Sequence, residues 1–185
     1  MKPPDRPLTN GTIVLRLREP KDQPLISAAS HDSETQRWLD DDPIPLDAAP
    51  AFRDPRETWS QGERAPFVIA DAVTDDALGL ASLRVVSEGT GSLAVSVFPE
   101  GRGRGVAPVA LRLIARWAIS DCGFRRVEAE ADVANNASRR AIEKAGFRSE
   151  GILPDHCETH GRRHDCAMFA LGSADLRGDA PLRGS

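Results

Sequence analysis

The sequence contains no tyrosine, and this absence limits the chemistry that the protein can use. It has only three cysteines in 185 residues, so a framework of several disulfides is excluded and reduced thiols are the simpler expectation. No apolar run approaches the ~20 residues of a membrane span. The net charge of −4 lacks the basic excess typical of nucleic-acid binding. Residues 1–10 have no apolar segment of the kind found in secretory signals, so a cytoplasmic location is expected.

The length and the hydrophobic content of 40% suit one domain with a substantial core. We expect a flexible lead over residues 1–10, a single domain over 11–172 and a flexible tail over 173–185. Neither a repeat nor a linker divides the chain.

A mixed α/β pattern fills the predicted domain. Strands are predicted where β-branched residues alternate with polar ones, at 12–18, 67–70, 78–86, 93–98, 127–133, 147–153 and 167–171. Helices are predicted from 20 to about 29, as short pieces within 33–62, from the glycine-rich stretch to 122, and from 136 to 145. Trp117 falls on the apolar face of the third of these and is expected in the core.

The most informative segment is Glu100-Gly-Arg-Gly-Arg-Gly105, which links a predicted strand to a predicted helix. Glycines allow successive backbone N–H groups to point at one anion, and a helix N-terminus adds positive potential. Arg102 and Arg104 add full charges. The segment therefore predicts a phosphate or pyrophosphate site.

Several ligands remain open for such a loop. A P-loop would need Lys-Ser/Thr after its last glycine, and Val106-Ala107 is different. A dinucleotide fingerprint would follow the first strand of a βαβ unit, whereas this loop follows roughly the fourth strand. Coenzyme A is the third ligand, and an ordinary strand–helix turn without a ligand is the alternative.

The segment Arg102-Gly-Arg-Gly105-Val-Ala107 resembles the pyrophosphate motif Gln/Arg-x-x-Gly-x-Gly/Ala of the GCN5-related (GNAT) N-acetyltransferases. Its flanks are similar to the RimJ/RimL-type branch, which includes ribosomal-protein alanine N-acetyltransferases. The flanking matches are Arg116-Trp117, Cys122 to Glu128, Asn135 to Ser138, Glu143 to Phe147, Glu150 to Leu153, Gly161 and His164-Asp165.

The resemblance implies an α/β (α+β) GNAT acyl-CoA N-acyltransferase fold, with a mixed, mostly antiparallel sheet of six to seven strands flanked by about four helices. It implies direct transfer of an acetyl group from acetyl-CoA to a primary amine, either a protein N-terminus or a small molecule. Acetyl-CoA would be the co-substrate, with no metal. A homodimer stays open.

The resemblance also implies roles for particular residues. The pyrophosphate would lie on the loop of Arg102, Gly103, Arg104, Gly105, Val106 and Ala107. A backbone N–H at Val97 or Phe98 would polarise the thioester carbonyl. Many GNAT enzymes protonate the leaving thiolate with a tyrosine, which is impossible here.

In the RimJ/RimL-type branch a serine takes the place of that tyrosine, and Ser138 matches it. Asn135 would contact the pantetheine arm, although both residues could simply cap a helix. The branch often has a glutamate as general base near the final hairpin. Cys157 occupies that position here, with Glu158 one residue on; His156 or water could serve instead. Apart from the resemblance, Trp38 and the acidic run Asp40 to Asp42 could attract a cationic amine, although a solvated acidic turn is the simpler interpretation.

The cluster His156-Cys-Glu-Thr-His160-Gly-Arg-Arg-His164-Asp-Cys166 could be written as a zinc site, but its spacing matches no standard finger. A polar hairpin beside the acceptor is the simpler interpretation, and covalent transfer through Cys157 is another. A catalytically silent coenzyme A sensor is the main alternative function. DNA binding through Arg102, Arg104, Arg112 and Arg116 lacks a recognition-helix layout.

Overall fold

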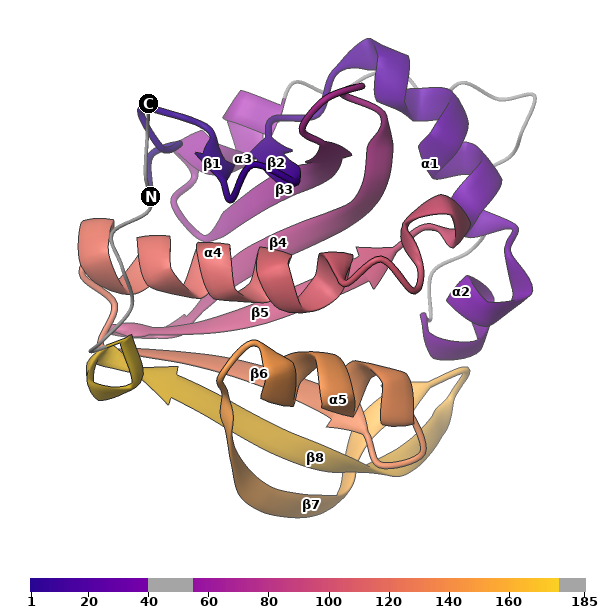
Figure 1. Cartoon of the computed structure of the whole chain (residues 1–185). Helices are drawn as coiled ribbons and strands as arrows, with labels where there is room; N and C mark the ends of the chain where they lie inside the picture. The colour runs from indigo at the N-terminus through magenta and orange to yellow at the C-terminus, as the bar shows by residue number, and fades with distance from the viewer. Residues whose placement is uncertain (40–54, 177–185) are drawn as a thin grey trace.

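The computed structural model describes residues 1–39 and 55–176, which build one mixed sheet with helices on both faces (Figure 1). The strand order is β1-β2-β3-β4-β5-β6-β8-β7. The strands are β1 (Leu8–Thr9), β2 (Ile13–Arg16), β3 (Arg64–Asp71), β4 (Ala77–Ser87), β5 (Thr90–Val97), β6 (Arg126–Asp132), β7 (Arg148–Thr159) and β8 (Arg162–Gly172). Within the described ranges only β5 and β6 run parallel, and every other neighbouring pair is antiparallel. The predicted mixed, mostly antiparallel sheet is confirmed, and the described residues form eight of its strands where six or seven were predicted.

Five α-helices lie within the described ranges, where about four were predicted. The helical segments are η1 (Pro20–Asp22), α1 (Gln23–Ser30), α2 (Ser33–Trp38), α3 (Pro55–Ser60), η2 (Pro99–Gly101), α4 (Val106–Asp121), α5 (Asn136–Lys144) and η3 (Ser173–Leu176). None of them is long and apolar enough to cross a membrane.

Both ends of the predicted domain are structured further than the sequence suggested. Leu8 is buried in β1, which pairs with β2, and Ser173–Leu176 form η3. The acidic run 40–42 and the rest of the predicted tail lie outside the described residues.

Helix α4 is held against one face of the sheet by a continuous apolar stripe. Ala110, Leu113, Ile114 and Trp117 are buried at the predicted i, i+3, i+4 and i+7 spacing. Trp117 packs edge-to-face on Phe67 and Trp59, with ring centroids 5.7 Å from each. These contacts confirm Trp117 as a core residue. They also fix the axis of α4, and therefore the place where its N-terminus meets the sheet.

A second apolar cluster covers the opposite face of β3 and β4. Ile26 and Ala29 of α1 pack there against Val68, Ala70 and Phe98. Because Val68 and Ala70 alternate with Phe67 and Ile69 of the main core, the two clusters occupy opposite faces of one strand. Helix α1 is thereby fixed beside the end of β5, and α2 follows it directly.

The parallel pair β5 and β6 separates partway along its length. Registered pairing ends at Leu93↔Ala129, although β5 continues to Val97 and β6 to Asp132. Figure 1 shows the two strands close together at their beginnings and spread apart toward α2. The separation opens the sheet at its centre.

Candidate active site

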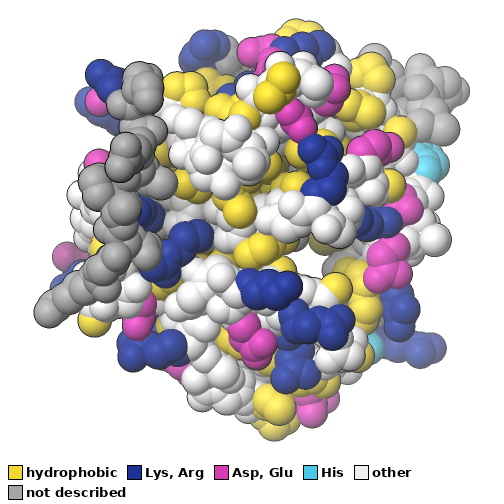
Figure 2. Space-filling model, in the orientation of Figure 1, with side chains coloured by type: hydrophobic (Ala, Val, Ile, Leu, Met, Phe, Trp, Pro, Cys, Tyr) yellow, Lys and Arg dark blue, Asp and Glu magenta, His cyan; other side chains and the backbone are white. Residues whose placement is uncertain are grey.

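One cleft of about 1660 Å³ passes through the gap between β5 and β6. Its walls come from the glycine-rich loop, from α2 and α5, and from the β7–β8 hairpin, segments that are far apart in the sequence. Figure 2 shows the molecule hollowed between α4 and α5, with Lys and Arg side chains gathered over α5. The cleft therefore joins the predicted cofactor loop to the predicted acceptor hairpin.

The loop needs glycine for two different reasons. Gly103 and Gly105 have φ angles of 74° and 72°, and a Cβ on either would meet nothing within 4 Å. Their requirement is conformational, since a left-handed backbone disfavours any side chain. At Gly101 the requirement is spatial, because a Cβ would lie 2.7 Å from the Leu78 carbonyl oxygen. The loop is thus packed against β4 at Gly101, and it makes left-handed turns at Gly103 and Gly105.

The loop presents backbone amides to the cleft. Val106 and Ala107 begin the 16-residue helix α4, so their N–H groups have no acceptor inside that helix. Gly103, Gly105, Val106 and Ala107 all line the cleft. The helix dipole adds positive potential at the same point. The geometry suits an anion such as a pyrophosphate.

The two loop arginines point to different places. Arg102 lines the cleft and pairs with Asp32, the residue that caps α2 by accepting the Thr35 N–H. The Arg102 hydrogen bond holds the pKa of Asp32 well below its usual range. Arg104 pairs with Asp71 at 2.6 Å and does not line the cleft. Of the two loop arginines, only Arg102 therefore lines the cleft.

The predicted carbonyl donor was either Val97 or Phe98. The Phe98 N–H donates to the Leu78 carbonyl oxygen at 2.8 Å, and its side chain is buried in the second core. Hydrogen-bonded pairs alternate with non-bonded pairs along antiparallel strands, so the Val97 N–H points away from β4, toward β6. Val97 lines the cleft, in the part of β5 that has already separated from β6.

Ser138 and Asn135 lie on the opposite wall. The Asn135 side chain accepts the Ser138 backbone N–H at 3.0 Å, which is the N-cap bond of α5. The capping interpretation is therefore correct for the Ser138 amide. Within the described part of the chain, the Ser138 hydroxyl makes no hydrogen bond, and both residues line the cleft.

Glu158 lines the cleft on β7, with Arg163 of β8 at 3.7 Å. Sequence reasoning missed a second carboxylate, Glu130 of β6, which lies one residue beyond the last β5–β6 pair. The nearest ionisable partner of Glu130 is His156, at 3.5 Å.

The alternation Val127-Glu-Ala-Glu-Ala-Asp132 could have signalled Glu130. It places three carboxylates on one face of β6, while the valine and the alanines are buried on the other. Of these three, Glu128 pairs with Arg126 at 2.8 Å. Asp132 accepts the Ala134 N–H at 2.7 Å. Glu130 is the one that neither an arginine nor the backbone holds within the described ranges.

Trp38 is at the end of α2 and lines the cleft near the hairpin. Its indole N–H donates to Glu34 at 2.8 Å, and the Arg37 guanidinium lies 4.8 Å from the ring centroid. The His160 ring nitrogen lies 2.8 Å from the Gln36 carbonyl oxygen. Helix α2 thus connects the loop, through Asp32, to the hairpin, through Gln36.

The expectation of reduced thiols was wrong for two of the three cysteines. Cys157 and Cys166 form a disulfide, and Cys122 alone is free. The pairing was hidden in the sequence because it depends on the register of β7 against β8. The cluster of His156, His160 and His164 lies on a hairpin, as predicted.

Arg140 and Lys144 of α5 also line the cleft, and no sequence pattern had singled them out. They lie on the exposed side of a nine-residue helix and extend the positive potential of the loop along one wall.

Residues 12–148 match the model of the acetyltransferase (GNAT) domain, so the chain belongs to the GNAT acetyltransferase family. The family expected from the glycine loop and its flanks is confirmed.

Two relatives from Bacillus match over nearly their whole length. The N-acetyltransferase p20 of Bacillus licheniformis, itself uncharacterized, is 22% identical over 90% of this chain and 96% of its own. YdaF of Bacillus subtilis, provisionally named a ribosomal N-acetyltransferase, is 25% identical over 92% of this chain and 96% of its own. The second likeness agrees with the RimJ/RimL-type branch.

Solved structures share the fold. Mycobacterium smegmatis RimJ in complex with CoA-disulfide superposes with a TM-score of 0.80 at 21% identity, covering 94% of this chain and 89% of that one. Spermidine N-acetyltransferase from Vibrio cholerae, in complex with CoA and spermine, gives a TM-score of 0.70 at 18% identity, over 89% and 97%.

Proposed function

We propose that this protein transfers the acetyl group of acetyl-CoA directly to a primary amine while both substrates are bound. The observation that carries the proposal is the single cleft that joins the glycine loop to the gap between β5 and β6. A pyrophosphate on the loop amides would direct the pantetheine arm into that gap, past Val97 and Ser138.

The half of the cleft next to the glycine loop, the cofactor half, is lined by predicted residues that each take a role in binding acetyl-CoA. The N–H groups of Gly103, Gly105, Val106 and Ala107 would bind the pyrophosphate, with Arg102 released from Asp32 to assist. Arg140 and Lys144 would contact further phosphate oxygens from α5. Asn135 borders the same wall, beside the pantetheine path.

The transfer itself needs three groups. The Val97 N–H would stabilise the oxyanion that forms when the amine nitrogen attacks the thioester carbonyl. Glu130 would accept the proton of the attacking amine, because among the described residues it is the β6 carboxylate that neither an arginine nor the backbone holds. Ser138 would donate its hydroxyl proton to the departing sulfur. Glu158 is the second candidate for the base, although Arg163 lies at 3.7 Å from its carboxylate.

The acceptor half is lined by Glu34, Glu130 and Glu158 together with Trp38. This combination favours a cationic amine, either a protein N-terminus or a small molecule, because carboxylates and an aromatic face both attract an ammonium group.

A thiol-release screen tests the proposal. The purified protein is incubated with acetyl-CoA and a panel of peptides, polyamines and amino acids, and free coenzyme A is measured. We expect amine-dependent thiol release and a mass gain of one acetyl group on the amine. Acetyl-CoA binding without release with any amine would contradict the transferase and support a sensor.

A further inference from the structure

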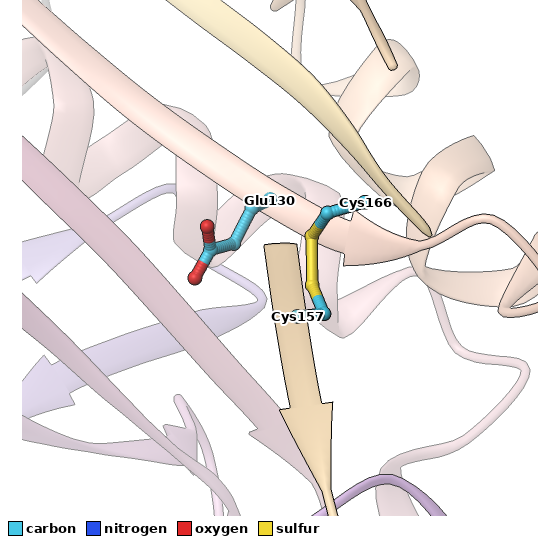
Figure 3. Close-up of side chains that lie close together, drawn as sticks. All are labelled: Glu130, Cys157 and Cys166. Carbon is cyan, nitrogen blue, oxygen red and sulfur yellow. A yellow bond between two sulfur atoms is a disulfide. The ribbon is translucent and has the colours of Figure 1, made fainter. Parts of the chain in front are cut away.

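The Cys157–Cys166 disulfide lies in the acceptor wall, away from the cofactor loop. Cys157 is half-buried on β7 and lines the cleft, whereas Cys166 on β8 is fully buried. Figure 3 shows the sulfur pair beside the Glu130 side chain, with the three residues coming from three neighbouring strands. A carboxylate oxygen of Glu130 and both sulfurs lie within 4.8 Å of one another.

The disulfide closes a bulge in β7. Leu153 pairs with Cys166 and Cys157 pairs with His164, so residues 154–156 face Asp165 alone. Asp155, inside this bulge, has a φ angle of 51°. The other links across the bulge are exposed hydrogen bonds, from the Asp155 N–H to the Asp165 carboxylate and from Arg163 to the Asp155 carbonyl oxygen, both 3.1 Å.

The sulfur bridge is therefore the covalent part of a weakly held region. Exposed hydrogen bonds with few apolar contacts open readily, and a crosslink across them limits that opening. His156 belongs to the bulge and lies 3.5 Å from Glu130, while Glu158 follows Cys157 directly. Any shift of the bulge would therefore change the position of Glu158 relative to Glu130, the other candidate base.

We propose that Cys157 and Cys166 form a reversible thiol–disulfide site that holds the acceptor wall in its working shape when oxidised. The kinetic part of this proposal rests on the transferase function proposed above. Reduction would release the bulge and place S–H donors beside Glu130, where they compete with the amine for the carboxylate. The cofactor loop comes from other elements, so acetyl-CoA binding would change little.

The exchange reaction follows from the unequal burial of the two sulfurs. A low-molecular-weight disulfide entering the cleft meets the Cys157 thiolate first; its S–S bond breaks, one half leaves as a thiol and the other stays on Cys157. The Cys166 thiolate then attacks the Cys157 sulfur and expels the second half. Two cysteine protons and one reagent disulfide give one protein disulfide and two small thiols.

Cys122 provides an internal control. It lies at the C-terminal end of α4, outside the cleft, and burial raises the pKa of its thiol to about 11. A thiol of that kind reacts slowly, because the thiolate is the nucleophile. Cys122→Ser should therefore leave both the redox transition and the kinetics as in the wild-type protein.

The test equilibrates the full chain in glutathione buffers of increasing oxidised fraction, traps thiols with N-ethylmaleimide in denaturant and measures intact mass. We expect one two-thiol transition, and a peptide map that links Cys157 to Cys166. In the reduced state, amide hydrogens of 157–164 should exchange about tenfold faster. The KM for the amine should rise about threefold or more, with the acetyl-CoA Kd nearly unchanged.

At every glutathione ratio, the double variant C157S/C166S should have the hydrogen-exchange rates and the amine KM of the reduced protein. Absence of the Cys157–Cys166 link at every glutathione ratio would overturn the proposal, as would a link that changes neither exchange nor the amine KM. One equivalent of zinc bound by the reduced protein and lost in Cys166→Ser would also overturn it, in favour of a metal site. Should no amine be acetylated, the mass and exchange measurements still decide the thiol question separately.

Discussion

The two halves of the cleft are built in different ways. The cofactor half relies on backbone groups. These are the glycines with positive φ, the first N–H groups of α4, and the Val97 N–H, which lies where β5 is no longer paired with β6. The acceptor half relies on side chains carried by a bulged hairpin and by a six-residue helix. Glycine spacing and a helix N-terminus are visible in a sequence, whereas the side chains of the acceptor half are brought together only by strand register.

The largest expected effect comes from the backbone half. Gly105→Val forces a β-branched residue into the left-handed region and turns the loop amides away from the anion. Losing two charge-assisted hydrogen bonds costs about 3 kcal/mol, or ~100-fold in acetyl-CoA Kd, measured by calorimetry.

Gly123 is the matched control for that substitution. It has a φ angle of 76°, and a Cβ there also meets nothing within 4 Å, but it follows the far end of α4 and is outside the cleft. Gly123→Val should lower stability similarly and keep the wild-type Kd. Equal losses of affinity in the two variants would remove the loop from the account.

The second effect compares the two carboxylates of the acceptor half. Glu130→Gln should lower kcat by about 10² because a positioned general base typically contributes 10²–10⁴. Glu158→Gln should cost less, since its carboxylate lies close to Arg163. Steady-state kinetics with a saturating amine checks both, and the reverse order would assign the base to Glu158.

The third effect concerns the wall shared by the two halves. Ser138→Ala should lower kcat by about tenfold with little change in acetyl-CoA Kd, since a thiol of pKa ~8.5 leaves without full protonation. Asn135→Ala, which removes the α5 cap, should instead cost about 1 kcal/mol of stability in urea unfolding. Unchanged turnover in Ser138→Ala would leave Ser138 with only its backbone role in the cap.

The smallest effect concerns the ion pair that holds Arg102. Asp32→Asn keeps a good capping residue on α2 but frees the guanidinium, which should tighten acetyl-CoA binding up to about fivefold at low salt. Because the pKa of Asp32 is lowered, its carboxylate stays ionised through the ordinary carboxyl range, and the pair is lost only as pH falls below that range. The wild-type Kd should therefore show no Asp32 titration between about pH 6 and 8. Weaker binding in Asp32→Asn would mean that Asp32 positions Arg102 for the ligand.

The sequence correctly predicted the helices that combine a regular apolar spacing with a glycine just after their last turn. The apolar stripe of α4, ended before Gly123, and the capped start of α5 at Asn135 both gave correct helices. The glycine loop was also correctly placed between a strand and a helix, although it follows the fifth strand rather than roughly the fourth. These features depend on residues close together in the chain, which is why they could be predicted without the fold.

Features that depend on pairing between distant segments were missed. The choice between Val97 and Phe98 depends on the β4–β5 register, and the Cys157–Cys166 bond depends on the bulge of residues 154–156. The pairing of Arg104 with Asp71 of β3 was also indicated by no local pattern, and the role of Arg104 at an anion stays a prediction. Glu130 was overlooked although its alternation with buried alanines was readable.

A crystal structure of the protein with bound coenzyme A tests the central claim most directly. The account predicts pyrophosphate oxygens about 2.7–3.2 Å from the N–H groups of Gly103, Gly105 and the first turn of α4, with the pantetheine arm between β5 and β6. Coenzyme A bound elsewhere, with those amides facing solvent and the gap between the two strands empty, would contradict it.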